Sequence, residues 1–239
     1  PIIIIGDSAL YGKSGKYVFE TLKNFLSDNN FIKKDWNALN ILTQQASRVG
    51  AIDCGVYSIN EEENFSFFNK LDNDSFKLIY LLGADNTYFD KKNKFVVYQG
   101  SHGDRGAEIA DIILPAAAYT EQEGHYTNLE GKIQKAFQAS YPPGDAKEDW
   151  KIVNDLSELL KMKKIFKNKD ELVDSLMNYL NLKKNNKDNE NFSTLEFIEE
   201  KISIDEIDYY YSNVIARASK TMSECRNNKI KLQETGTEG

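Results

Sequence analysis

The chain has 239 residues, of which 41% are hydrophobic and 28% are charged. It is therefore long enough for one large domain or for one domain with appendages. Its formal net charge of −7 argues against a surface for nucleic acid or anionic lipid, because phosphate recognition needs clustered lysine and arginine. No apolar stretch of the sequence approaches the roughly 18 residues that cross a bilayer, so direct membrane insertion is not expected.

Cysteine is scarce in this sequence. Cys54 and Cys225 are far apart and form no Cys-x-x-Cys pair, so this chain alone offers no zinc site and no iron–sulfur cluster. Two reduced thiols are the simplest interpretation. The chain opens at Pro1 directly on an apolar run, without an initiator Met or a signal-peptide pattern. This start predicts a fragment or a processed product of a longer polypeptide.

The first 115 residues show the pattern of alternating strands and helices. Residues 1–6 form a β-branched run that ends in glycine, which is typical of a strand buried on both faces of a parallel sheet. Apolar residues at helical spacing predict two helices, over residues 15–27 and 36–49, the second ending near Gly50. Three further strands are predicted over residues 76–83, 94–100 and 111–115.

This order of elements predicts an α/β fold with a doubly wound, mostly parallel, Rossmann-like sheet. The carboxyl ends of parallel strands meet at one edge of such a sheet, and ligands bind there in open α/β folds. The residues that follow the predicted strands at this edge are Gly6, Asp7, 83–85, 100–102 and Pro115.

The character of the chain changes near residue 150. Amphipathic patterns predict helices over residues 152–160 and 171–182. A helical pattern resumes over residues 192–204, and a last helical or partly extended segment follows over 205–222. Between and after these helices, an Asn/Lys-rich stretch and the C-terminal tail have almost no apolar residues, which predicts surface loops or disorder over 182–191 and 234–239.

Two domains are therefore expected. The first, over residues 1–150, is an α/β domain that is incomplete by itself and continues a larger domain on another chain or segment. The second, over residues 151–239, is a helical C-terminal extension with Asn/Lys-rich loops.

Two glycines bracket a short polar turn in the first domain. Gly103 and Gly106 flank Asp104 and Arg105, and a helical run follows. Because glycines let backbone N–H groups approach an anion, the turn could cradle a phosphate. It could equally be a tight turn into a helix that Asp104 caps. The spacing is not Gly-x-Gly-x-x-Gly, and no P-loop lysine follows.

Titratable side chains gather on both sides of residue 120. His102 and His125 are the only histidines, and Glu121, Glu123 and Glu130 lie close together in sequence. An acid–base pair is conceivable from these residues. A closed transition-metal site lacks ligands, because two histidines without a nearby cysteine do not complete a coordination shell. A buried, hydrogen-bonded polar network explains the same residues.

Several separate stretches resemble one protein family, in the same order along the chain. They are residues 35–50, 81–85, 98–115 running on through 149–152, and 211–222. Together they resemble the C-terminal, molybdopterin-oxidoreductase-like region of the large iron–sulfur (75-kDa) subunit of respiratory complex I, which in bacteria is the G-type subunit of NADH-quinone oxidoreductase. The likeness covers about two thirds of the chain and leaves the Asn/Lys-rich stretches unmatched.

The resemblance implies a part of that subunit that transfers no electrons itself. In the family the iron–sulfur clusters lie in the N-terminal part, so this chain is expected to hold no cofactor and a companion polypeptide or segment is expected to hold the clusters. The family's C-terminal region keeps the molybdoenzyme fold but has lost the molybdopterin, so no catalytic or metal-binding residue carries over. The vestigial cofactor-binding candidates are Gly83, Asp85, Gly103, Asp104 and Gly106.

The function that the resemblance implies is scaffolding in the peripheral arm of NADH:ubiquinone oxidoreductase, on the matrix side of the mitochondrial inner membrane. The expected partners are the other peripheral-arm subunits, above all the cluster-bearing half of the same subunit. The chain would then be a split-gene product or a fragment of the longer subunit. Two alternatives stay open: an active molybdopterin- or nucleotide-binding oxidoreductase, and a free-standing protein-binding α/β domain.

Overall fold

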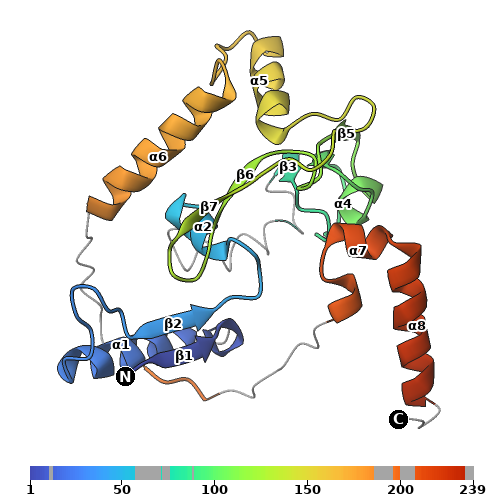
Figure 1. Cartoon of the computed structure of the whole chain (residues 1–239). Coiled ribbons are helices and arrows are strands. Elements are labelled where there is room, and N and C mark those ends of the chain that lie inside the picture. The colour runs from blue at the N-terminus through green and yellow to red at the C-terminus, as the bar shows by residue number, and fades with distance from the viewer. Residues whose placement is uncertain are drawn as a thin grey trace. The chain divides into compact units, whose positions relative to one another are not determined.

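The computed structural model describes residues 1–10, 13–56, 71, 76–87, 89–185, 196–199 and 208–234. Figure 1 shows the helices and strands of the chain. The chain divides into two compact units, each built from segments that are discontinuous in sequence. The first unit comprises Pro1–Tyr57, His125–Ala136 and Asn168–Asp205, and the second comprises Ser58–Gly124, Phe137–Lys167 and Glu206–Gly239. The expected division into residues 1–150 and 151–239 stays a prediction.

The first unit contains a two-stranded parallel sheet. Strand β1 (Ile3–Gly6) pairs with β2 (Leu39–Leu42), and β1 leads through the short 3-10 helix η1 (Asp7–Leu10) toward helix α1 (Gly15–Asp28). The predicted strand over 1–6 and helix over 15–27 are thus confirmed. Leu26, Ala38 and Leu39 form the buried centre of this unit.

Burial of β1 on both faces was predicted and is wrong for this structure. The strand alternates between half-buried and exposed residues, and Ile4 is 57% exposed. The reason is that β1 lies in a sheet of only two strands, which buries one face against α1 and its neighbours and leaves the other open.

The helix predicted over residues 36–49 is also wrong. Leu39–Leu42 forms strand β2, and Trp36 lies in an antiparallel bridge with Lys33 and is 48% exposed. Pairing with β1 satisfies the backbone of this segment, and such tertiary pairing overrides a short helical periodicity. Gly50 does not cap a helix end, because it lies inside the short helix α2 (Arg48–Asp53).

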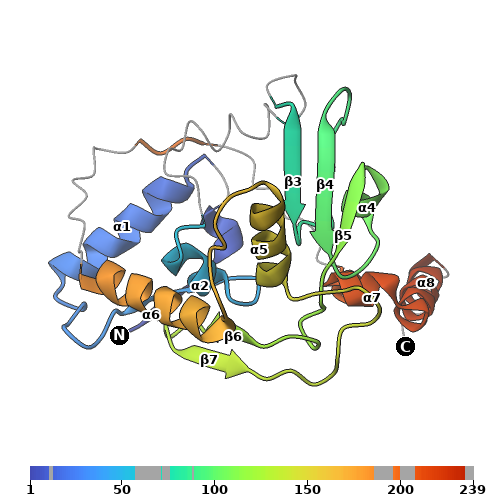
Figure 2. The ribbon, with the colours of Figure 1, turned by 90° about the horizontal axis from the view of Figure 1, so that it is seen from above.

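The second unit is built on a three-stranded parallel sheet (Figure 2). The strands β3 (Leu78–Leu82), β4 (Phe95–Gly100) and β5 (Ile112–Pro115) lie in that order, and helix α4 (Arg105–Glu108) connects β4 to β5. These strands confirm the predictions over 76–83, 94–100 and 111–115. Pro115, which cannot donate to a ladder, is the last residue of an edge strand.

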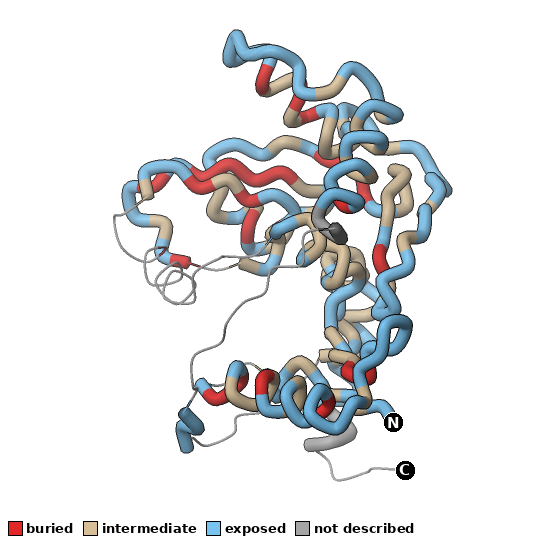
Figure 3. Tube along the Cα trace, turned by 90° about the vertical axis from the view of Figure 1, so that its left-hand side faces the viewer, coloured by how far each residue is buried: buried red, intermediate tan, exposed pale blue. Residues whose placement is uncertain are grey.

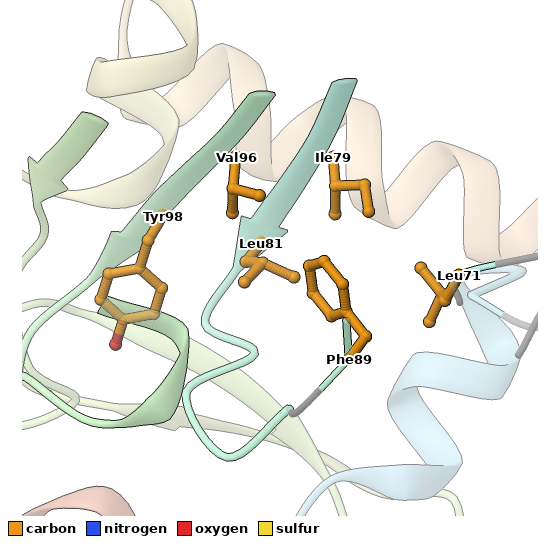
Figure 4. Close-up of a cluster of buried hydrophobic side chains, with 6 residues drawn as sticks. All are labelled: Leu71, Ile79, Leu81, Phe89, Val96 and Tyr98. Atoms are coloured by element: carbon orange, nitrogen blue, oxygen red, sulfur yellow. The ribbon is translucent and has the colours of Figure 1, made fainter. Parts of the chain in front are cut away.

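The core of the second unit lies against one face of this sheet. The central strand β4 is the most deeply buried element, with residues 96–99 all buried, as expected for a strand that has a neighbour on each side. Buried residues elsewhere form short runs separated by exposed ones (Figure 3). The core cluster, drawn in Figure 4, consists of Leu71, Ile79, Leu81, Phe89, Val96 and Tyr98.

A β-hairpin was not predicted from the sequence. Strands β6 (Gly124–Thr127) and β7 (Ile133–Ala136) form a two-stranded sheet. The Asn128 side chain organises the turn between them, because its Oδ1 accepts from the backbone N–H groups of Glu130 and Lys132 at 3.0 and 2.9 Å. Gly131 completes the turn at φ +78°.

The C-terminal third of the described chain is helical. Helices α5 (Asp149–Leu159) and α6 (Lys169–Asn185) confirm the predictions over 152–160 and 171–182. The 3-10 helix η2 (Tyr209–Tyr211) and helices α7 (Val214–Ala218) and α8 (Lys220–Glu234) follow. None of the helices in the described part of the chain is long and apolar enough to cross a membrane.

The loop predicted over 182–191 is wrong at its start, because α6 continues to Asn185; the rest of that stretch lies outside the described residues. In the segment predicted as helical over 192–204, residues 196–199 have no regular structure and the others lie outside the described residues, as does the tail from 235. The predicted fold class is confirmed as a mixed α/β fold with parallel sheets and C-terminal helices. Its parallel strands are shared between two sheets.

Candidate functional site

The carboxyl ends of β3, β4 and β5 lie at one edge of the sheet, where ligands bind in open α/β folds. Residues 83–85 follow β3. Gly100 is the last residue of β4, and residues 101–102 follow it. Gly6, which ends β1, and Asp7, which follows it, were expected at the same edge but belong to the other sheet. The vestigial candidates lie in the turns at this edge or at the start of α4, and they are Gly83, Asp85, Gly103, Asp104 and Gly106.

Two carboxylates at this edge share one arginine. Arg217, in helix α7, donates from Nε to Asp104 Oδ2 at 2.5 Å, and its Nη2 lies 3.1 Å from Asp85 Oδ1. The arginine and Asp104 side chains are 18% exposed and that of Asp85 is 22% exposed. The C-terminal extension therefore reaches into the sheet edge and links its two acidic turns.

Local structure positions each member of this group. Asp104 precedes helix α4 and its Oδ1 accepts from the N–H of Arg105 at 2.8 Å. The backbone carbonyl of Asp85 accepts from the N–H of Gly106 at 3.0 Å. Asn213 caps α7 by accepting from the N–H of Ala216 at 2.9 Å, and this cap fixes the turn from which Arg217 extends.

The charges in this group are paired. Burial raises the pKa of the Asp104 carboxyl, but the hydrogen bonds from Arg217 and from the Arg105 N–H, with the charges of both arginines, outweigh it and hold that pKa below its ordinary value. Arg217 contacts both carboxylates, and the charge of Arg105 also acts on Asp104. The arrangement holds chain segments together, and its carboxylates are already occupied by the chain's own cation.

The glycines at the edge make room for protein atoms. A Cβ on Gly106 would lie 2.9 Å from the carbonyl oxygen of Ala84 and 3.0 Å from the Tyr98 ring. Gly103 and Gly83 have no atom within 4 Å of such a Cβ, and Gly83 adopts φ +61°. Gly106 is therefore required by the close approach of Tyr98 and Ala84, and Gly83 by its left-handed backbone.

Tyr98 lies beneath the acidic pair. Its hydroxyl donates to the backbone carbonyl of His102 at 2.8 Å. Burial raises the pKa of Tyr98 to about 12, the charges of Asp85 and Asp104 act in the same direction, and the charge of Arg217 opposes them. The phenol is therefore neutral at physiological pH and serves as a hydrogen-bond donor.

A second polar cluster lies at the end of β4 and was missed from the sequence. Gln99, with no exposed surface, donates from Nε2 to Asp149 Oδ1 at 2.8 Å, and Gln122 Nε2 donates to Asp149 Oδ2 at 3.1 Å. The hydroxyl of Tyr80 donates to Gln99 Oε1. One carboxylate at the start of α5 thus fixes that helix to the central strand. The available signal was a glutamine inside an otherwise apolar buried strand.

Three of the other titratable candidates, His102, Glu121 and Glu130, have contacts within a few residues. Glu121 accepts from the N–H of Ala118 at 2.9 Å and closes a turn. The His102 ring lies 2.9 Å from Ser101 Oγ, and Glu130 accepts from the Asn128 amide at 3.4 Å. Cys54 and Cys225 are free thiols. Within the described ranges, no group of three or more His, Cys, Asp or Glu side chains could hold a metal ion.

Arg217 was also missed from the sequence as a site residue. The signal for it was weak: a single arginine in the otherwise apolar run 214–218, preceded by a capping asparagine. Its two partners lie more than a hundred residues earlier, and local pattern does not show such a pairing.

The two segments joined by the contact of Arg217 with Asp85 and Asp104 each match a known protein family. The molybdopterin oxidoreductase family matches residues 1–159, which include Asp85 and Asp104. The family of the C-terminal region of the NADH-ubiquinone oxidoreductase G-type subunit matches residues 180–225, which include Arg217.

The curated relatives agree with these matches. The chain is 39% identical over 99% of its length to the G-type subunit of the NADH-quinone oxidoreductase of Rickettsia bellii, and 36% identical over 94% to the NADH-ubiquinone oxidoreductase 75 kDa subunit of Reclinomonas americana. It is also 36% identical over 94% of its length to the mitochondrial 78 kDa subunit of Candida albicans. It spans 34%, 34% and 32% of these proteins, about a third of each. The resemblance noted from the sequence is confirmed.

Proposed function

Because this chain belongs to the molybdopterin oxidoreductase family, we propose that it is a non-catalytic structural part of the peripheral arm of NADH:ubiquinone oxidoreductase. The names of its relatives support a place in that complex. The Candida albicans relative is named as a mitochondrial protein, which supports a mitochondrial location. Within the mitochondrion, the proposed position is at the inner membrane, on the matrix side.

The contact of Arg217 with Asp85 and Asp104 is the observation that carries the non-catalytic part of the proposal. A pterin dinucleotide at this sheet edge would need hydrogen-bond donors for its phosphates. The edge presents instead two carboxylates whose shared cation comes from the chain's own C-terminal segment. The space beside Gly106 is filled by Tyr98 and Ala84. The residues present do not fit the cofactor.

The same contact describes how the chain would act as a scaffold. A C-terminal segment fixed to the sheet edge by a partly buried ion pair gives the second unit a defined shape. The chain would bury the flank of the cluster-bearing polypeptide, exclude water from it and fix distances to neighbouring subunits. The iron–sulfur clusters would belong to that companion polypeptide, and the partners would be the other peripheral-arm subunits.

Native isolation of the tagged chain tests this proposal. Co-purifying proteins are identified, and iron and molybdenum are measured on this polypeptide after its separation from them. Recovery in a large NADH-oxidising assembly, with iron confined to other chains, is the expected result. A lone protein that retains molybdenum or a pterin would overturn the proposal.

A variant makes the test specific to the sheet edge. Arg217→Met frees both carboxylates and should lower the yield of assembled complex without changing the metal content of this chain. Lys220→Met is the matched control, because Lys220 begins the next helix and is exposed. A loss of bound pterin or molybdenum in Arg217→Met would identify the edge as a cofactor site.

A further inference from the structure

Four large apolar side chains at the end of helix α5 and in the loop after it are exposed. Figure 1 shows this helix and the loop that leads from it toward α6. Leu159 is 80% exposed, Leu160 63%, Met162 65% and Ile165 52%. We refer to residues 159–167 as the α5 loop. Exposed apolar side chains that gather in one short segment mark an interaction surface more often than single ones do.

The α5 loop is held in one conformation by two buried side chains. Asn154, 5% exposed, donates from Nδ2 to the Phe166 carbonyl at 2.6 Å and accepts on Oδ1 from the N–H groups of Ile165 and Phe166 at 3.0 and 3.2 Å. Ser157, 8% exposed, donates to the Lys163 carbonyl at 2.9 Å. The exposed apolar groups therefore stand on a fixed backbone.

Lysines alternate with these apolar residues along the loop. The α5 loop contains Lys161, Lys163, Lys164 and Lys167 and no carboxylate, in a chain whose formal net charge is −7. Lys164 forms an ion pair with Glu158 at 3.2 Å, just before the loop. The α5 loop thus combines exposed apolar side chains with exposed lysines, and a complementary partner presents apolar and acidic side chains.

We infer that the α5 loop is the docking surface for the polypeptide that corresponds to the rest of the relatives' length, through apolar side chains together with aspartate or glutamate. This inference rests on the proposed function. The chain spans only about a third of its relatives, so a companion polypeptide of about twice its length is available to cover the loop. Because Asn154 and Ser157 fix the backbone in advance, docking loses little conformational entropy, which favours a protein partner over a fluid lipid surface.

Oxidation of methionine in the assembled complex tests the inference. Of the three methionines, Met162 lies in the α5 loop, and Met222, half-buried in α8 of the same unit, is the internal control. Dilute peroxide is applied to the isolated chain and to the native complex, and sulfoxide is measured at each methionine by mass spectrometry. We expect oxidation of Met162, relative to that of Met222, to be about tenfold slower in the complex.

The outcomes separate the two proposals. If the chain is recovered in the complex and Met162 is oxidised as fast as in the isolated chain, the docking inference is wrong and the proposed function stands. If the chain is never recovered with complex I polypeptides, the proposed function fails. Protection of Met162 by vesicles of phosphatidylcholine and phosphatidylserine, without protection in the complex, would assign the loop to lipid and overturn the inference.

Charge reversal gives a second readout. The double variant Lys161→Glu with Lys163→Glu places two acids opposite the acidic side chains of the partner, and it should reduce retention of the companion polypeptide about tenfold, less so at high salt. Lys220→Glu, a reversal on an exposed helix of the same unit, is the control. Equal retention by the double variant and the control would contradict the inference.

Discussion

Arg217 and Asp104 lie 113 residues apart in sequence, and their side chains are joined by a hydrogen-bonded ion pair. The pair connects the residue that precedes α4, at the carboxyl edge of the parallel sheet, with a helix of the C-terminal extension. A contact between such distant segments is the kind that a scaffold requires, because it fixes the chain's end against its core. It also accounts for acidic residues at a position where related folds bind phosphate groups.

Replacing Arg217 should destabilise the second unit. Arg217→Met removes the guanidinium that the carboxylates of Asp85 and Asp104 share. We expect the free energy of unfolding to fall by about 2 kcal/mol, less than for a fully buried pair because the side chains keep some exposure. Urea unfolding followed by circular dichroism measures the change. Arg217→Lys should recover only part of it, since an ammonium does not reproduce the forked contact.

The ion pair of Arg217 with Asp104 should make the free energy of unfolding depend on pH in the acidic range. The pKa of Asp104 in the folded chain is lower than in the unfolded chain, where it is about 4. Its contribution is therefore present above pH 4 and is lost as the pH falls through the folded-state pKa. The difference in unfolding free energy between the wild type and Arg217→Met should accordingly shrink on acidification. Asp111 and Asp208 also have lowered pKa values, but they are present in both proteins and cancel.

Two glycines three residues apart should respond differently to alanine. Gly106→Ala places a methyl group against the Ala84 carbonyl and the Tyr98 ring, and we expect a loss of about 2 kcal/mol in unfolding free energy. Gly103→Ala has open space around the new methyl group and should change stability by less than about 0.5 kcal/mol. Thermal unfolding of the two variants gives the comparison. Equal effects would show that Gly106 is not required for packing.

The strands of the second unit were predictable because their signal is local. Continuous apolar runs that end in glycine or proline indicate parallel strands, and β3, β4 and β5 pair in parallel. The central strand β4 is buried over residues 96–99, whereas the edge strand β5 is largely exposed. The segment 39–42 was misjudged because its four residues are too short for periodicity to decide, and only its pairing with β1 makes it a strand.

The candidate site was predictable only in part. Asp104 was expected either at a phosphate cradle or as a helix cap, and it is a cap. Its charge partner, Arg217, lies 113 residues away in sequence and meets it only through tertiary packing. No periodic pattern in the sequence indicates such a contact. The hydrogen bonds from Gln99 to Asp149 are of the same kind, since each residue alone has an ordinary local explanation.

Loss of the Asp149 carboxylate should destabilise the second unit about as much as loss of Arg217. It accepts from two glutamine side chains, and Gln99 is fully buried, so Asp149→Ala leaves a buried amide without its main partner. The expected loss is about 2 kcal/mol in unfolding free energy. Asp155→Ala, which removes an exposed ion pair with Lys147, should cost less than about 0.5 kcal/mol and is the matched control.

Asp149→Asn distinguishes hydrogen-bond geometry from side-chain size. The asparagine keeps the shape of Asp149 but has one acceptor oxygen where the aspartate has two. Its NH2 group must therefore face the NH2 group of either Gln99 or Gln122, and neither of these can accept a hydrogen bond. Rotation of the Gln122 amide does not solve this, because its Nε2 also donates to the Ala117 carbonyl at 3.1 Å. We therefore expect Asp149→Asn to destabilise the chain nearly as much as Asp149→Ala in urea unfolding. Wild-type stability in Asp149→Asn would show that a single acceptor is sufficient at the junction of α5 and β4.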